Sequence, residues 1–402
     1  MPATASFGKR DLRQKQRLAA GSPVLAAADA SPRAWAEART PAWPVLTIVL
    51  CLVLAAIFYA EQLYGVHPSR TFALGLPSLV ALGGVDRYLV ADRHEWWRLL
   101  TASLLHANLV HIGGNLIVLA IAGWRLERLV GRAWLTAAFA LGAIAGSIGS
   151  ISLNDAHTVS VGASGAIMCL VALLFTLSFH AEAADNANRI RRFALFLLIP
   201  ALLPSVTDGG GQVDIGAHFG GILMGTALGF FLLAIWPETG ERPPLRSLAG
   251  AAAALVLAVA TFAALEMTGA YPAYAARGAG LAPPNEIPSS DAKASAAAPE
   301  LARKYPHDPV VRLLRAIAFL DQHDASDAEE QIRAGLAEKE TLAIEYPSEV
   351  RQHLETVLAM TLAVEGKRES ARVAAAPICA LATSDVFMRK ARFFLKEHGA
   401  CG

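Results

Sequence analysis

The chain has 402 residues, of which 54% are hydrophobic and only 17% are charged, and its mean hydropathy is +0.41. This composition excludes an ordinary soluble enzyme and indicates a protein that crosses a membrane several times. The formal net charge of +1, without a basic stripe interleaved with aromatic residues, gives no support to a nucleic-acid partner.

The first 43 residues are polar compared with the apolar run that begins at Pro44, and they carry five basic residues between Lys9 and Arg17. This cluster lies too far from the first apolar run to be the start of a cleaved signal peptide. We therefore expect residues 1–43 to be a disordered basic tail that stays in the cytoplasm.

Seven apolar segments come after this tail, and most approach the roughly 20 residues that a helix needs to cross a bilayer. They cover residues 44–63, 99–122, 134–153, 159–179, 193–206, 215–236 and 248–265. The fifth is short and is interrupted by Pro200 and Pro204. The predicted fold class is all-α: a polytopic membrane helix bundle with a six-helix core in residues 44–240 and a seventh helix in 241–268.

The distribution of arginine predicts the orientation of this bundle. With the N-terminus in the cytoplasm, the inner loops contain Arg125, Arg128, Arg132, Arg189, Arg191, Arg192, Arg242 and Arg246. The outer loops at 154–158 and 207–214 contain no Lys or Arg. The positive-inside rule thus favours a cytoplasmic N-terminus. The alanine-rich composition is compatible with a bacterial inner membrane, with an organelle membrane as the alternative.

A serine and a histidine inside these segments are candidates for chemistry, because ionisable side chains at membrane depth are costly and mark functional sites. Ser164 follows the outer loop that ends near Thr158 by six residues, and His218 follows Asp214 by four. At a rise of about 1.5 Å per residue, both lie roughly 6–9 Å below the outer surface. A serine hydroxyl needs an adjacent base, so we expect Ser164 to be the nucleophile and His218 its base.

The motifs around these residues resemble those of the rhomboid family of intramembrane serine proteases. The resemblance covers about residues 40–240. It includes Gly162-Ala163-Ser164-Gly165, Ala217-His218-x-x-Gly221-x-x-x-Gly225, His111-x-x-x-Asn115, Gly123-x-x-x-Glu127-x-x-x-Gly131 and Trp97-Arg98. It implies a serine endopeptidase with a Ser-His dyad that works without metal or cofactor. Its partners would be the lipid bilayer and transmembrane protein substrates, cut in or beside their membrane segments near the outer surface.

The resemblance also implies that the side chains of His111 and Asn115, with the backbone N–H of Ser164, form an oxyanion hole. Residues four apart share one face of a helix. For both to lie level with Ser164, their helix must begin near Asn108 and not at Leu99. Residues 96–107 then form a partly inserted loop element.

Other positions are expected to support the dyad. His106 matches a histidine that recurs in the family, and we interpret it as positioning the loop. Met168 stands where the family frequently has an aromatic residue against the catalytic histidine, and its thioether can pack there instead. Asp214 we interpret as the N-cap of its helix and not as a third catalytic residue.

Glycines are expected to hold the segments close together. Gly162 and Gly165 flank the nucleophile, and Gly221 follows His218 on a stripe of small residues that permits close helix contact. A bulky side chain at Gly221 would separate His218 from Ser164. Glu127, between its own two glycines on the cytoplasmic side, is interpreted as a structural hydrogen-bonding site.

Three alternatives to a protease remain to be compared with it. A catalytically silent rhomboid-like protein that binds membrane clients is the main one, although such relatives usually lose a catalytic residue. A soluble α/β-hydrolase would need Gly-x-Ser-x-Gly, and position 166 is alanine. A transporter or channel would be expected to have paired charges inside its apolar segments, and the sequence shows none there.

The last third of the chain changes character. Residues 269–299 are rich in Ala, Pro, Gly and Ser and are predicted to be a flexible linker. Residues 300–402 are predicted to form a soluble, extracytoplasmic helical domain similar to tetratricopeptide-type repeats, in which Ser326-x-x-Glu329 is a capping box. It would bind a protein partner or only stabilise the chain. An oxidising compartment would permit a disulfide between Cys379 and Cys401, which the sequence leaves open.

Overall fold

The computed structural model describes residues 43–67, 71–155, 158–180, 187–203, 213–237, 242–288, 290–380 and 386–401. Regular structure in these ranges is helical, and the extended pairing consists of two isolated antiparallel bridges, Ala73 with Asn108 and Val85 with Ser160. The chain is therefore an all-α protein in its described part.

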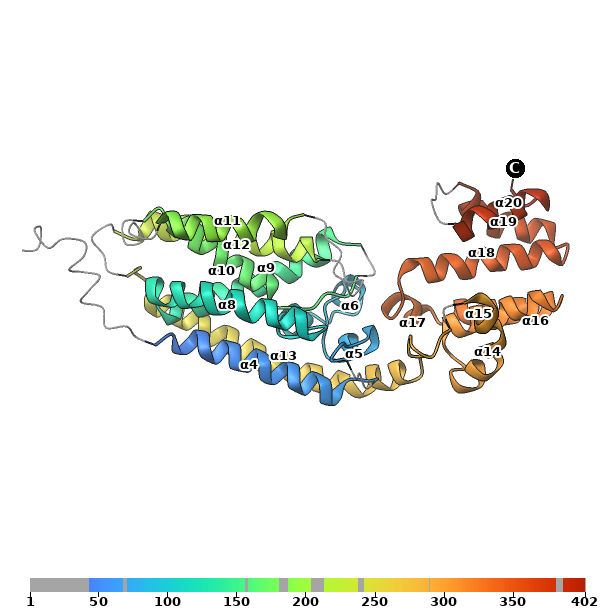
Figure 1. The fold of residues 1–402 in the computed structure, drawn as a ribbon, viewed down its shortest axis with the longest axis horizontal. Coiled ribbons are helices and arrows are strands. Elements are labelled where there is room, and N and C mark those ends of the chain that lie inside the picture. The colour runs from blue at the N-terminus through green and yellow to red at the C-terminus, as the bar shows by residue number, and fades with distance from the viewer. Residues whose placement is uncertain are drawn as a thin grey trace, which may run out of the picture. The chain divides into compact units, whose positions relative to one another are not determined.

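Five helices in the described ranges are long and apolar enough to cross a membrane. They are α4 (Val45–Tyr64), α8 (Leu109–Val130), α9 (Arg132–Leu153), α12 (Ile215–Ile235) and α13 (Arg246–Ala279). The shorter helices α10 (Ser164–Leu177) and α11 (Ala187–Ala201) run beside them in the same bundle (Figure 1). Large apolar side chains face outward, including Leu52, Ile117 and Phe230, each more than 60% exposed. An apolar surface of this kind suits lipid, as expected of an integral membrane protein.

Helix α10 forms the centre of the bundle and is buried along most of its length between α8, α9, α11 and α12. Its contact with α12 is made by backbone, because a Cβ at Gly221 would collide with the Gly165 carbonyl and one at Gly225 with the Cys169 carbonyl. A Cβ at Gly146 of α9 would lie only 3.0 Å from Gly165 Cα. The predicted role of glycine in close helix contact is confirmed at these positions.

Short helices connect α4 to α8 on one side of the bundle: α5 (Leu76–Ala81), α6 (Arg87–Ala91), α7 (Arg98–Thr101) and η1 (Ala102–Leu104). Arg98 is fully buried among them and donates to the carbonyls of Val80 and Gly84 at 2.8 and 2.9 Å. It also pairs with Glu95 at 2.6 Å. The Trp97-Arg98 motif therefore holds this connection together.

Glu127 has the structural role that the sequence predicts. Its carboxylate accepts hydrogen bonds from the backbone N–H groups of Leu46 and Thr47 at 3.0 and 2.9 Å, and from the Thr47 hydroxyl at 2.8 Å. Arg132 approaches the same carboxylate at 3.2 Å. The group joins the start of α4 to the end of α8.

Several segment boundaries differ from the predicted ones. Helix α8 begins at Leu109, where the Asn108 side chain accepts the His111 N–H at 2.9 Å, so the start near Asn108 is confirmed and the one at Leu99 is wrong. The helix continues past 122 to Val130, because buried Leu126 extends its apolar face and Gly131, at φ +86°, ends it. The stretch between the predicted segments 99–122 and 134–153, expected to be an inner loop, is thus mostly helix.

The C-terminal part also contains more helix than predicted. It comprises α14 (Asp291–Lys304), α15 (Pro309–Asp321), α16 (Ala325–Ala337), α17 (Lys339–Ile344), α18 (Ser348–Val364), α19 (Arg368–Ala380) and α20 (Val386–Glu397). Most of the predicted linker 269–299 lies in α13 and α14, because alanine has the highest helix propensity of all residues. The predicted capping box is wrong, since Asp324 caps α16 by accepting the Asp327 N–H.

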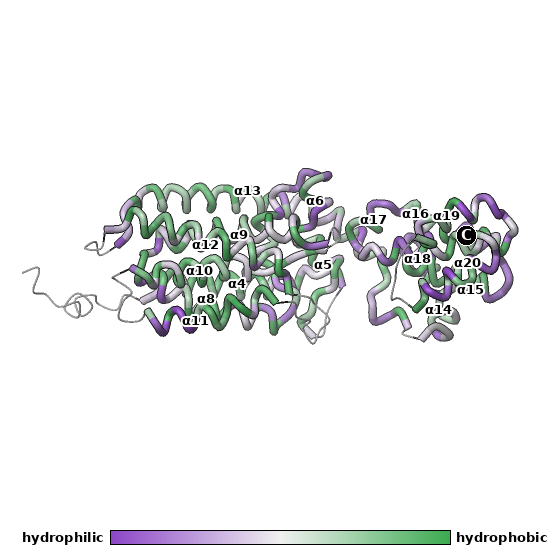
Figure 2. The backbone as a smooth tube through the Cα atoms, turned by 90° about the horizontal axis from the view of Figure 1, so that it is seen from above, coloured by the Kyte–Doolittle hydropathy of each residue, from purple (hydrophilic) through white to green (hydrophobic). Residues whose placement is uncertain are grey.

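Apolar side chains form the interior of this C-terminal part. Along its backbone, hydrophobic and hydrophilic residues alternate (Figure 2). One cluster includes Ile332 and Leu354, and another includes Ile378 and Leu395. A disulfide joins Cys379 to Cys401, with 5.7 Å between their Cα atoms. The pairing that the sequence left open is therefore made.

Candidate active site

Ser164 is the first residue of α10 and is half-buried. The preceding segment is fixed by backbone hydrogen bonds: Ser160 pairs with Val85, and the Gly162 N–H donates to the Ala102 carbonyl at 2.9 Å. Gly162 has φ +128°, a conformation that favours glycine. The first-turn N–H groups of a helix have no intrahelical acceptor, so those at Ser164 are available to a ligand.

His218 lies in α12, and the residue before it, Ala217, contacts Gly165, the residue after Ser164 in α10. A Cβ built on Gly165 would be 3.2 Å from the Ala217 carbonyl oxygen, and Gly221 also meets Gly165. The two candidate residues are therefore each one position away from a backbone contact between α10 and α12. No hydrogen bond joins their side chains in the part of the chain that the structure describes, and such bonds are often long in enzymes without substrate.

The imidazole of His218 has a defined orientation that the sequence did not predict. Its Nδ1 lies 2.7 Å from the carbonyl oxygen of Ala201, the last residue of α11. A carbonyl can only accept, so Nδ1 must carry the proton and donate. In the neutral ring this leaves Nε2 with a free lone pair, the form that a general base requires.

His111 and Asn115 face the backbone just before Ser164. A Cβ built on Gly162 would lie 2.7 Å from both Cε1 and Nε2 of His111 and 3.7 Å from Nδ2 of Asn115. Two polar side chains from one face of α8 thus approach the start of α10. Such donors could stabilise negative charge on an oxygen placed beside Ser164.

His106 connects to this pair from the preceding loop. It is fully buried, and its Nε2 lies 2.9 Å from the Asn115 amide nitrogen, which donates. Its ring meets that of His111 edge to face, with 5.1 Å between centroids. The three side chains form one group.

Glu61 of α4 also belongs to this region, and sequence reasoning missed it. Its carboxylate is buried and accepts the backbone N–H of His106 at 3.0 Å. An acidic residue within the first apolar segment was a signal that could have identified it, because charges at membrane depth usually have a function.

The remaining predicted supporting residues lie near the nucleophile. Met168 is buried one turn after Ser164 in the interior of the bundle. Asp214 caps α12 by accepting the Ala217 N–H at 2.7 Å, so its predicted N-cap role is confirmed. Within the described ranges, no three His, Cys, Asp or Glu side chains gather in a way that would hold a metal ion.

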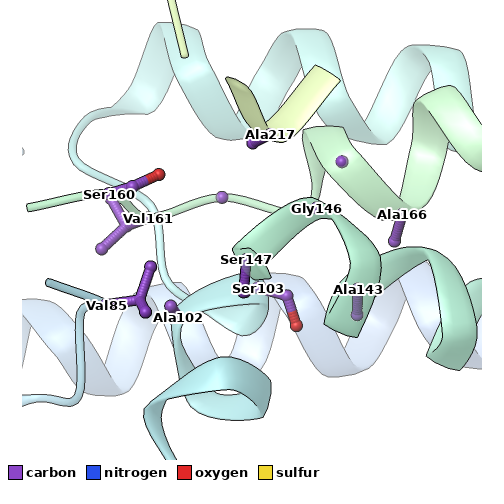
Figure 3. A pocket seen from close by; sticks show the side chains of 12 residues that line it. Val85, Ala102, Ser103, Ala143, Gly146, Ser147, Ser160, Val161, Ala166 and Ala217 are labelled. Carbon is purple, nitrogen blue, oxygen red and sulfur yellow. The ribbon is translucent and has the colours of Figure 1, made fainter. Parts of the chain in front are cut away.

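A small cavity lies behind the start of α10 (Figure 3). Its lining includes the hydroxyl residues Ser103, Ser147 and Ser160 together with Gly165 and Ala217. The space open to a water-sized sphere is about 10 Å³, roughly what one water molecule needs. The fold therefore leaves room for about one water molecule beside Gly165, the residue after Ser164.

Comparison with known proteins found a family model and several relatives that match this part of the chain. A family model described as the Rhomboid domain matches residues 93–235, which include Ser164, His218, His111 and Asn115. The protein named "Putative rhomboid protease YdcA" of Bacillus subtilis is 30% identical over 190 residues, 47% of this chain and 88% of that protein. The rhomboid protease GluP of the same organism is 32% identical over 151 residues, 37% of this chain and 28% of that protein.

Plant proteins are similar over the same extent of chain. RHOMBOID-like protein 5 of Arabidopsis thaliana is 36% identical over 172 residues, 42% of this chain and 54% of that protein. This chain spans about half the length of such plant relatives. Helices α13 to α20 lie beyond the residues that the family model matches.

Proposed function

Because the chain belongs to the rhomboid family, we propose that it is an intramembrane serine endopeptidase that cleaves transmembrane or juxtamembrane segments of other membrane proteins. In this proposal Ser164 Oγ attacks the scissile carbonyl carbon while His218 Nε2 takes its proton. His111, Asn115 and the Ser164 N–H stabilise the oxyanion. His218 then gives the proton to the leaving amine, and an acyl-enzyme remains on Ser164.

Hydrolysis of the acyl-enzyme by water completes the cycle, and His218 again acts first as a base and then as an acid. His218 removes a proton from a water molecule that attacks the ester carbonyl, and the proton returns to Ser164 as the ester bond breaks. This step needs water at membrane depth. The hydroxyl-lined cavity beside Gly165 supports such access.

The observation that carries the proposal is the glycine-mediated contact of α10 with α12. In this contact Gly165 lies against Ala217, so the residue after Ser164 touches the residue before His218. His111 and Asn115 face Gly162, two residues before Ser164. The candidate nucleophile, the candidate base and the two candidate oxyanion donors therefore lie within a few residues of one backbone contact, which supports the proposal. The Ala201 carbonyl adds support, because it selects the basic tautomer of His218.

We extend the proposal to topology. Helix α13 has 34 residues, about 50 Å at the helical rise, which exceeds the roughly 30 Å of a bilayer core. As a seventh crossing from a cytoplasmic N-terminus, it would bring α14 to α20 to the outer side. The Cys379–Cys401 disulfide suits that oxidising compartment. The tetratricopeptide-like character of this part and its protein partner stay proposals.

The test is cleavage by the purified full chain in proteoliposomes containing a labelled single-span substrate with small, helix-breaking residues in its membrane segment. We expect cleavage by the wild type, none by Ser164→Ala and none by His218→Ala. The exposed Ser152 of α9 offers a matched control, and Ser152→Ala should cleave like the wild type.

A fluorophosphonate that labels nucleophilic serines gives a readout independent of the substrate chosen. Labelling of the wild type but not of Ser164→Ala is expected. A wild-type chain that is folded but neither cleaves nor reacts would instead favour the alternative, a silent rhomboid-like protein that binds membrane clients.

A further inference from the structure

Asp214 makes more contacts than a helix cap requires. Its Oδ1 accepts the Ala217 N–H at 2.7 Å, which is the ordinary N-cap bond at the start of α12. The same oxygen accepts from the Asn154 side-chain amide at 2.7 Å. The second oxygen, Oδ2, accepts from the Ser160 hydroxyl. One carboxylate therefore joins the start of α12 to two residues, Asn154 and Ser160, that lie between the body of α9 and the start of α10.

Each of these segments leads to the candidate site or supports it. Ser160 precedes Ser164 by four residues, and Asp214 precedes His218 by four. The bond between Ser160 and Asp214 thus joins the two segments at points that are each four residues before the candidate nucleophile and the candidate base. Figure 3 shows Ser160 and Ala217 around the same cavity, with Ser160 on the segment that enters α10.

Asn154 anchors this link to the rest of the fold. Asn154 ends α9, and its side-chain oxygen accepts the Gly216 N–H at 3.3 Å. Arg87 holds the end of the same helix by donating to the carbonyls of Ile151 and Asn154 at 2.6 and 2.9 Å. These bonds hold the start of α12 to the end of α9. Because of them, α12 would stay in place if the segment at Ser160 moved away from Asp214.

We propose that Asp214 is a positioning residue, whose carboxylate holds the start of the His218 helix and the segment that enters Ser164 at a fixed separation. The inference rests on the proposed protease function and assigns Asp214 no proton transfer. Backbone contact at Gly165 and Gly221 fixes the two helices below the dyad, and the Asp214 bonds fix them above it. The dyad is held between two points of contact.

Serine caps a helix about as well as aspartate but is too short to reach two further side chains. Asp214→Ser therefore keeps the cap and removes the link, Ser160→Ala removes the link from the other side, and Ser160→Thr keeps a hydroxyl. We measure the rate of fluorophosphonate labelling, kcat and KM for the transmembrane substrate, and the thermal unfolding temperature of the full chain, with Ser152→Ala as control.

Both Ser160→Ala and Asp214→Ser should lower the labelling rate and kcat by about tenfold or more, because small misplacements of reacting groups are costly. We expect an unchanged KM, an unfolding temperature close to that of the wild type, restored activity in Ser160→Thr, and no further loss in the double variant. Unchanged labelling in the two single variants would overturn the positioning role alone. Rate losses that follow equal losses of thermal stability, or that multiply in the double variant, would do the same. A wild type that does not react overturns the proposed function itself.

Discussion

The helices that are apolar enough for a membrane and the helices after residue 290 are held together in different ways. In the bundle, α9, α10 and α12 meet at glycines, where backbone touches backbone, beside a cluster of buried apolar side chains. In the C-terminal part, interiors are built from side chains such as Ile332, Leu354 and Leu395, with a disulfide at the end. Lipid supplies no hydrophobic force between helices, so close contact must replace it. If the C-terminal part lies in water, as we propose, the hydrophobic effect supplies that force and apolar side chains suffice.

The two regions also differ in how they accommodate a buried carboxylate. Glu127 in the bundle receives donors from Leu46, Thr47 and Arg132, so its charge is well compensated. Glu345, just after α17, is only 3% exposed, and neither of its oxygens has a hydrogen-bond partner in the described structure. The first group joins two helices. The second is a local weakness of the packed C-terminal part.

The largest effect is expected from adding one methyl group in the bundle. Gly221→Ala places a Cβ against the Gly165 carbonyl, and neither helix can move without losing the other contacts of α10. We expect a loss of about 4 kcal/mol in unfolding free energy together with loss of Ser164 labelling. Unfolding in detergent, followed by circular dichroism, measures the first quantity.

Gly113→Ala is the matched control, because Gly113 is also helical but nothing lies within 4 Å of its added Cβ. Here the better helix propensity of alanine should leave stability unchanged or raise it by up to about 1 kcal/mol. Equal effects of the two substitutions would contradict the view that backbone contact holds the bundle together.

Removing the disulfide should weaken the other region. The bond closes a loop across a sequence separation of 22, so Cys379→Ala with Cys401→Ala should cost about 3 kcal/mol. Hydrogen exchange measured by mass spectrometry should increase in α18 to α20 and stay constant in α9, α10 and α12.

Reductant should reproduce this change in the wild type and have no effect in the double variant. Cys51→Ala, which removes a free cysteine of the bundle, serves as control. Faster exchange throughout the membrane helices would show that the two regions are not held independently.

The smallest effect concerns pH. Burial raises the pKa of Glu345 from its ordinary 4.5 to about 7, although Arg277 and Arg98 act in the opposite direction. The folded state binds this proton more tightly than the unfolded state, so stability is greatest below about pH 4.5 and falls as pH rises through about 7. Glu345→Gln should remove this dependence and stabilise the C-terminal part above pH 7, by at most about 3 kcal/mol.

Hydrogen exchange of α17 and α18 at pH 5 and pH 8 measures this difference. The exposed Glu330 provides the comparison, since Glu330→Gln should leave the pH dependence unchanged. The wild-type exchange rates are corrected for the intrinsic effect of pH. Equal corrected rates at pH 5 and pH 8 would contradict a destabilising buried carboxylate at position 345.

Much of the bundle follows from local sequence. Apolar length predicts the crossing helices, Asn108 and Asp214 mark two helix starts, and the spacing of Gly221 and Gly225 predicts a close contact. These features are readable because each depends on residues within a few turns of one helix. Motifs of the same local kind single out Ser164 and His218 as candidates.

Other features depend on which distant segments meet, and only the tertiary structure decides them. The Ala201 carbonyl selects the tautomer of His218, Glu61 holds the His106 loop, and Cys379 finds Cys401. Boundaries also changed where packing outweighed composition, as when α8 continued through the predicted loop. The spacing of apolar and polar residues along each helix can be read from the sequence. The partners of its polar groups are fixed only when the helices pack, because hydrogen bonds and disulfides need contact at a few ångströms between residues far apart in the chain.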